Sequence, residues 1–122
     1  MRLFQRKDKA EGQSAAIAAF WQWWPGVRDQ LDAGIRDGSV RAHAEMIGKK
    51  VDAIHGDLEW ELTPGRTATH ALVVTSAGNP GLRAVAARWL AAAPQPDDLW
   101  EYHDIRIADP DVSATRSSSS AI

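Results

Sequence analysis

The sequence predicts an α+β domain in which three N-terminal helices are followed by a β-β-α-β arrangement. Apolar residues recur with helical spacing over residues 14–56, roughly the first half of the chain. Strand-like patterns replace them over residues 57–75. A further helical pattern lies between the second and third predicted strands, which favours a right-handed crossover. We therefore expect a small mixed sheet with helices packed on one of its faces.

The first predicted helix covers residues 14–24. Ser14 is a favourable residue for the helix start because its hydroxyl can accept a backbone hydrogen bond. Pro25 and Gly26 end the helix, since proline lacks the backbone N–H that the helical ladder requires. The apolar residues with i, i+3, i+4, i+7 spacing are Ile17, Phe20, Trp21 and Trp24.

Two more helices are predicted before residue 57. The second ends before Gly38, and its apolar face carries Val27, Leu31 and Ile35. Ser39 is expected to cap the third helix with its side chain, and Gly56 to close it. The apolar stripe of the third helix consists of Val40, Ala44, Ile47, Val51 and Ile54.

The pattern then changes to that of strands. Residues 57–62 alternate between acidic and apolar side chains, which is typical of a strand with one solvated face. Residues 63–66 form a turn that contains proline and glycine. Residues 69–75 are β-branched and largely uncharged, so we expect a more buried strand that pairs with the first.

A fourth helix and a third strand complete the predicted fold. Asn79 is expected to cap the helix, with Pro80 at its first position. The helix ends at residues 94–96, and residues 100–107 form the last strand. The buried face of the helix carries Leu82, Val85, Ala86, Trp89 and Leu90.

Length and composition limit the classes of protein that remain. The chain has 122 residues, enough for one domain, and a formal net charge of −2. The absence of cysteine excludes a disulfide scaffold, a zinc-thiolate site and a cysteine nucleophile. The charge balance argues against a nucleic-acid partner, and no apolar run approaches the roughly 18 residues that a transmembrane helix needs.

We expect the ordered domain to cover residues 14–108. Residues 1–13 are predicted to be a flexible, basic N-terminus, and residues 109–122 a disordered serine-rich tail. Leu3 and Phe4 lie beside basic residues, so weak contact with an anionic membrane surface is an alternative to a solvated terminus. The basic start lacks the apolar segment of a signal peptide, which indicates a cytoplasmic location.

Histidine and acidic residues offer a weak candidate for a reactive site. If their strands are neighbours, His70 and His103 can approach each other and share a site with Asp57 or Asp104. The alternative is that these histidines make ordinary hydrogen bonds. The loop at residues 76–81 lacks the pattern of a phosphate-binding loop, and we expect no cofactor and no metal.

Two further features indicate surfaces rather than reactions. Asp57, Glu59 and Glu61 share one strand face, which is either solvated or covered by a basic partner. Six tryptophans are present, and five of them have positions suited to the core. Trp23 points about 200° away around the first helix, so it is the candidate for an interaction surface.

Several segments share a pattern with a known group of proteins. These segments are residues 20–24, 54–62, 70–78, 91–94 and 100–102. They belong to the Phe-Trp-Gln-Trp-Trp helix, the hairpin, and the helix that ends in Trp-Leu-Ala-Ala-Ala-Pro at residues 89–94. Together they resemble an uncharacterised bacterial domain-of-unknown-function family over residues 14–108. The resemblance implies an α+β domain and assigns neither a substrate nor a catalytic residue.

Members of that family continue into a second α/β region, so this chain resembles the N-terminal part only. A missing half would leave apolar surface exposed or available for self-association. From these observations we expect a small, non-catalytic cytoplasmic domain that acts by protein–protein interaction or self-association. The alternative is a hydrolase-like enzyme, or an enzyme subunit, that uses His70 or His103 with an acidic residue.

Overall fold

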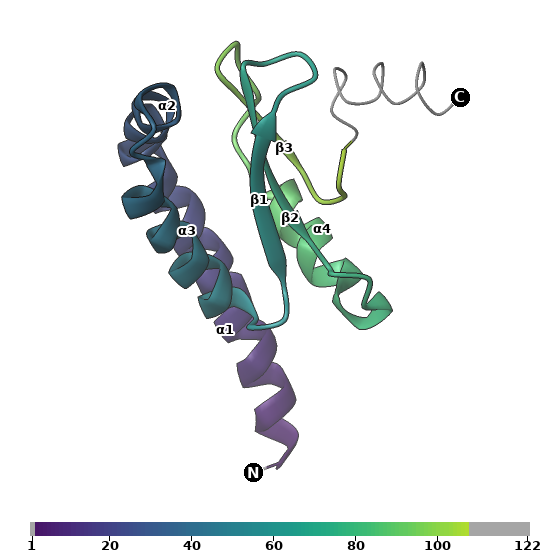
Figure 1. The fold of residues 1–122 in the computed structure, drawn as a ribbon. Helices are drawn as coiled ribbons and strands as arrows, with labels where there is room; N and C mark the ends of the chain where they lie inside the picture. The colour runs from purple at the N-terminus through teal and green to yellow at the C-terminus, as the bar shows by residue number, and fades with distance from the viewer. Residues whose placement is uncertain (1, 108–122) are drawn as a thin grey trace, which may run out of the picture.

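The computed structural model describes residues 2–107, with side chains from residue 11 onward (Figure 1). The predicted α+β class and the order of its elements are confirmed. The predicted tail at residues 109–122 lies outside the described residues. In chain order the elements are helix α1 (Arg2–Trp23), the 3-10 helix η1 (Trp24–Gly26), α2 (Arg28–Asp37), α3 (Val40–Ile54), strands β1 (Glu59–Pro64) and β2 (His70–Thr75), the 3-10 helix η2 (Pro80–Leu82), α4 (Arg83–Ala91) and β3 (Trp100–His103).

Helix α1 begins earlier than the sequence pattern suggests. It starts at Arg2, so the predicted start at Ser14 is wrong and Ser14 lies inside the helix. Residues 2–13 contain mostly good helix formers and no proline, which allows the helix to continue in the N-terminal direction. Figure 1 shows this first part of α1 extending beyond the other elements. The flexibility expected for residues 1–13 stays a prediction.

Helices α2 and α3 follow the predicted apolar faces but differ at their junction. Gly38 has φ +85° and ends α2 in the left-handed conformation that glycine tolerates. Ser39 does not cap α3 with its side chain. Its backbone N–H and its hydroxyl both donate to Asp37 Oδ1, at 2.9 and 2.6 Å. Ser39 therefore bonds to the Asp37 carboxylate rather than to helix N–H groups. These two bonds hold the pKa of Asp37 below its usual value.

The strands form one mixed sheet in the order β1-β2-β3. β1 and β2 are antiparallel, whereas β2 and β3 are parallel and connected through η2 and α4. As predicted, Asn79 caps this connection, because its side chain accepts a hydrogen bond from the Gly81 N–H at 2.9 Å. β3 is shorter than predicted and ends at His103, before Asp104, which is a poor strand former.

The core lies between one face of the sheet and the helices. Leu72 and Val74 of β2 share this face with Trp100 and Tyr102 of β3, since His70 pairs with Trp100 and Leu72 with Tyr102. All four helices contribute to the same cluster, which includes Ile17, Phe20, Trp21, Leu31, Ile47, Val51, Ile54, Val85 and Trp89. The predicted packing of helices on one sheet face is therefore confirmed.

Tryptophan side chains link the two halves of the chain. Trp24, Trp89 and Trp100 are at most 1% exposed. The Trp21 Nε1–H donates to the Trp89 carbonyl at 2.8 Å, and the Trp24 Nε1–H donates to the Tyr102 hydroxyl at 2.9 Å. These bonds satisfy indole donors that burial removes from water. The core placement expected for these four tryptophans is confirmed, while Trp60 is half-buried and packs against the cluster.

Candidate interaction site at the edge of strand β1

Strand β1 forms one edge of the sheet and pairs, within residues 2–107, with β2 alone. The Gly65 N–H donates to the Thr69 carbonyl at 3.1 Å, one residue beyond the Pro64–His70 pair, whereas the Thr69 N–H donates to the Asp98 carbonyl at 2.9 Å. The Gly65 bond sets the alternation of the β1–β2 ladder. Hydrogen-bonded and non-hydrogen-bonded pairs alternate along an antiparallel ladder. Glu59, Glu61 and Thr63 therefore direct their backbone groups toward β2. The backbone N–H and C=O groups of Trp60 and Leu62 consequently point outward, away from the sheet.

The β2–β3 pairing agrees with this assignment. The His70 N–H donates to the Leu99 carbonyl at 2.9 Å, on the β3 side of the strand. His70 is opposite Pro64 in the non-hydrogen-bonded class, so its backbone should face away from β1, as it does. Pro64 ends the outward-facing edge because it has no N–H to offer. The edge thus presents two N–H donors, at Trp60 and Leu62.

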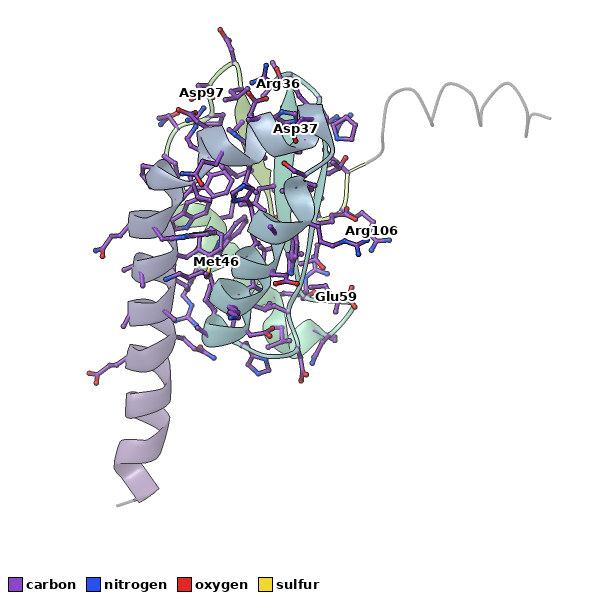
Figure 2. All side chains as sticks on the ribbon, turned by 60° about the vertical axis from the view of Figure 1, so that its left-hand side comes forward. Arg36, Asp37, Met46, Glu59, Asp97 and Arg106 are labelled. Carbon is purple, nitrogen blue, oxygen red and sulfur yellow. The ribbon has the colours of Figure 1, made fainter. Side chains whose placement is uncertain are left out.

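The side chains of β1 give this edge two different faces. Trp60 and Leu62 are half-buried and pack against the core cluster. Glu59 and Glu61 lie on the opposite face, where Glu59 is exposed. Figure 2 shows Glu59 at the surface on the side of the molecule where Arg106 also lies. Of the three acids predicted to share this face, Glu59 and Glu61 therefore do so, whereas Asp57 precedes the strand because β1 begins at Glu59.

An open cavity of about 310 Å³ adjoins the edge. Its lining includes the carboxylates of Asp52, Glu59 and Glu61, and one guanidinium, that of Arg106. The Arg106 Nε lies 3.6 Å from Glu61 Oε2, with Arg106 74% exposed. Such an exposed pair is weak because water screens it. Carboxylates outnumber cations, so the cavity favours positively charged groups.

A second cavity of about 330 Å³ continues along the start of β1. It shares Glu59 and Arg106 with the first cavity and also includes Asp104 and Ile105. Ile105 is 60% exposed, and only one other large hydrophobic side chain of the described part, Met46, is also exposed. Arg83 also lines this second cavity, so its two carboxylates are matched by two guanidinium groups, and the acidic excess is confined to the first cavity.

The structure does not bring His70 and His103 together. Their strands are neighbours, as the prediction required, but His70 is opposite Trp100 and His103 is opposite Val73. His70 and Val73 are three positions apart along β2, and an odd offset places side chains on opposite faces, so the two imidazoles lie on opposite faces of the sheet. The expected shared site of the two histidines is wrong for this geometric reason.

Each histidine instead contacts a carboxylate that the sequence analysis did not single out. The buried His70 Nε2 donates to Asp32 Oδ1 at 2.8 Å, and Asp32 Oδ2 accepts a bond from Arg36 at the same distance. The bond from His70 holds the pKa of Asp32 below its usual value. His103 Nε2 donates to Glu101 Oε2 at 2.7 Å. These contacts fit the alternative interpretation of ordinary hydrogen-bonding histidines.

The acidic residues proposed as partners lie elsewhere. Asp57 is exposed between α3 and β1, where its backbone N–H donates to His55 Nδ1 at 3.0 Å. Asp104 follows β3 and lines the second cavity. Within the described part of the chain, no three histidine or acidic side chains gather in a way that could hold a metal ion.

Trp23, the predicted interaction residue, is half-buried at the margin of the core. Its ring meets Phe20 edge-on with 5.5 Å between centroids, and Lys50 Nζ lies 5.7 Å from its centroid. The Phe20 contact lies within α1, whereas the Lys50 contact joins α1 to α3 through the attraction between a cation and an aromatic face. The role of Trp23 as an interaction surface stays a prediction.

Glu101 is the main polar residue that sequence reasoning missed. It is buried, and its carboxylate accepts backbone N–H bonds from Arg66, Thr67 and Ala68 at 2.9, 2.8 and 2.7 Å. Burial tends to raise its pKa, but these bonds and the one from His103 outweigh it and hold the pKa at about 2. Its only signal in the sequence is an acid between two aromatic residues of a predicted strand. The carboxylate fastens the β1–β2 loop to β3.

Comparison of the chain with models of known protein families, with curated proteins and with solved structures finds no significant match. The resemblance described above therefore stays a prediction. Within the described residues, no helix has both the length and the apolar character needed to cross a membrane. The cytoplasmic location stays a prediction, as does membrane contact by residues 2–9, whose side chains lie outside the described part.

Proposed function

We propose that this chain is a protein-interaction module that binds an extended segment of another polypeptide. The segment adds to the sheet as a fourth strand beside β1. The observation that carries this proposal is the outward direction of the Trp60 and Leu62 backbone groups. An edge strand with unpaired backbone groups is a ready template for a further strand, and several peptide-binding domains use this mode.

The shape of the edge also supports strand addition. Six residues of β1 pair in regular register with β2, so its backbone is held straight by the sheet. The β1–β2 loop is fixed by the Glu101 carboxylate, which limits the conformational freedom that binding would have to remove. A preformed edge of this kind favours binding of an extended chain.

The alternative of a hydrolase-like enzyme finds less support. His70 and His103 are on opposite sheet faces, and each is bound to a carboxylate that already has other donors. A general base must reach the proton that it removes, and the His70 side chain is only 9% exposed. We therefore propose binding rather than catalysis as the function of the domain.

Amide hydrogen exchange tests the proposal residue by residue. In the isolated chain, the Trp60 and Leu62 amides should exchange much faster than those of Glu61 and Thr63, which bond to β2. Ten-residue peptides that alternate threonine or valine with charged or amide side chains serve as probes. At least one peptide should slow exchange at Trp60 and Leu62 while leaving Glu61 and Thr63 unchanged. If peptides of every charge leave both outward amides unprotected, the proposal is wrong.

A further inference from the structure

We infer that the segment accepted by β1 is basic, with lysine or arginine at alternating positions, and that it belongs to a protein other than this chain. This inference rests on the proposed function and specifies its partner. The evidence is the combination of the outward backbone edge, the charge of the face beside it, and the poor fit of a second copy of β1.

Charge complementarity identifies the side chains that the segment should carry. Alternate side chains of an added strand lie beside Glu59 and Glu61, which are two residues apart on one face of β1. Glu59 is exposed and makes no ion pair with the described residues, and Asp52 adds a third carboxylate to the same cavity. Opposite charges directly across two strands stabilise the pair, whereas like charges destabilise it.

The pair of Arg106 with Glu61 shows that a guanidinium fits this face. Arg106 reaches Glu61 from the segment after β3, but the 3.6 Å separation is too long for a good hydrogen bond. A cation on an added strand would lie directly across from the carboxylate. It can therefore form the shorter, charge-assisted bond that Arg106 does not make.

A second copy of β1 is a poor occupant of the same edge. In a two-fold antiparallel pair, the outward-facing residues Trp60, Leu62 and Pro64 must supply the new hydrogen bonds. If Trp60 or Glu61 lies at the two-fold axis and faces its own copy, one glutamate is directly opposite another. If Leu62 or Thr63 lies at the axis instead, the ladder requires a hydrogen bond donated by Pro64, which has no N–H. Each register thus either opposes like charges or loses ladder bonds.

Matched peptides separate the charge preference from strand addition itself. Three ten-residue probes alternate threonine and valine with lysine, glutamine or glutamate. The lysine peptide should bind roughly tenfold more tightly than the glutamine peptide, and the glutamate peptide should not bind measurably. Higher salt should weaken the lysine peptide most, because ionic strength screens exposed charges. Binding is read from protection of the Trp60 and Leu62 amides and from tryptophan fluorescence.

A charge-matched pair of variants locates the preference on β1. The double variant Glu59→Gln, Glu61→Gln should lose most of the tenfold preference and retain its binding of the glutamine peptide. The control variant Asp29→Asn, Glu45→Gln removes the same charge from exposed positions on α2 and α3 and should keep the preference. Thermal unfolding of both variants checks that the fold is unchanged.

The failures of the two proposals are distinguishable. Equal binding of all three peptides at the outward amides would overturn the basic partner and leave strand addition intact. Concentration-dependent protection of the same amides without peptide, together with a dimer by light scattering, would replace the partner with a second copy. Absence of protection with every peptide would overturn both proposals.

Discussion

A single buried carboxylate controls the conformation of the β1–β2 loop. Glu101 accepts the backbone N–H groups of three consecutive residues, Arg66, Thr67 and Ala68, and it also accepts from His103. Hydrogen bonds to a charged acceptor are roughly twice as strong as neutral ones. Each of these loop donors would otherwise be a polar group with no partner at a partly buried site.

We predict that Glu101→Gln lowers the free energy of unfolding at pH 7 by about 1–3 kcal/mol. Glutamine keeps one oxygen for Thr67 and Ala68, but its NH₂ group faces the Arg66 N–H, which is also a donor. Urea denaturation measures the change. Glu59→Gln is the control, because Glu59 is exposed and should change stability by less than about 0.5 kcal/mol. Equal stability of the two variants would contradict this role of Glu101.

The pKa of Glu101 also predicts how stability depends on pH. Its folded value of about 2 lies below the ordinary value of 4.5, so the unfolded state binds the proton more tightly. This contribution to stability is complete above about pH 5 and is lost as the pH falls toward 2. Asp97 acts in the same direction, since its bond from Arg28 holds its pKa at about 2.

We therefore predict that the wild-type chain loses more stability between pH 5 and pH 2.5 than Glu101→Gln does. The lowering of the Glu101 pKa from 4.5 to about 2 corresponds to at most about 3 kcal/mol of folding stability. Urea denaturation of both proteins across this pH range measures the difference. Parallel stability profiles would show that the Glu101 carboxylate is not the titrating group.

The residue scale also shows what sequence reasoning can miss. The N–H donors to Glu101 are 33 to 35 residues away in the chain. Periodicity describes neighbours along one element, so it cannot indicate which loop covers a given strand residue. The same limit applies to Asp32, which contacts His70 across 38 residues.

Among the elements, the turn after β1 has the strictest steric requirement. A Cβ atom on Gly65 would lie 2.3 Å from the Ala68 carbonyl oxygen and 3.0 Å from Glu101 Oε1. The first contact involves backbone, which cannot rotate away as a flexible side chain can. Glycine at this position therefore allows the loop to close tightly over the carboxylate.

We predict that Gly65→Ala lowers the melting temperature and destabilises the chain by about 1–3 kcal/mol, as overpacking does elsewhere. Gly56→Ala is the matched control, because a Cβ at Gly56 meets no atom within 4 Å. Thermal unfolding followed by circular dichroism compares the two variants. A Gly65→Ala chain as stable as the control would mean that the loop does not close in the way described.

Helices and strands with strong apolar patterns could be predicted from the sequence. The residues at which the helices begin could not, because neighbouring residues can extend a helix or bind the side chain that was expected to cap it. The apolar faces of α2 and α3 and the cap at Asn79 followed from spacing and residue type. The start of α1 did not, because Ser14 has helix formers on both sides and the helix continues past it. Ser39 did not cap its helix, and its hydroxyl instead donates to the Asp37 carboxylate two residues earlier.

At the scale of the whole molecule, the acidic edge could be predicted only in part. The alternation at residues 57–62 indicated an acidic strand face, and the structure places Glu59 and Glu61 on it but leaves Asp57 before the strand. The position of β1 at the sheet edge depends on β3 docking beside β2, which no pattern within β1 specifies. The proposed binding site could therefore be recognised only after the strand order was known.

The tryptophan cluster joins the N-terminal helices to the β half through long-range bonds. Trp24 donates to Tyr102 across 78 residues, and Trp21 donates to the Trp89 carbonyl across 68 residues. The rings of Trp24 and Trp100 also make an edge-to-face contact, with 5.0 Å between their centroids. Neither half can bury these rings without the other, so we expect the chain to unfold in one cooperative step.

Denaturation of the wild-type chain and of Tyr102→Phe tests this expectation. Tryptophan fluorescence and far-ultraviolet circular dichroism should give coincident transitions for both proteins, because the core and the helices unfold together. Tyr102→Phe leaves the buried Trp24 N–H without its acceptor and should lower the free energy of unfolding by about 1–3 kcal/mol. Both signals should shift by the same amount. A fluorescence transition that moves while the circular dichroism transition stays in place would show that the helices are stable without the sheet, contrary to a single shared core.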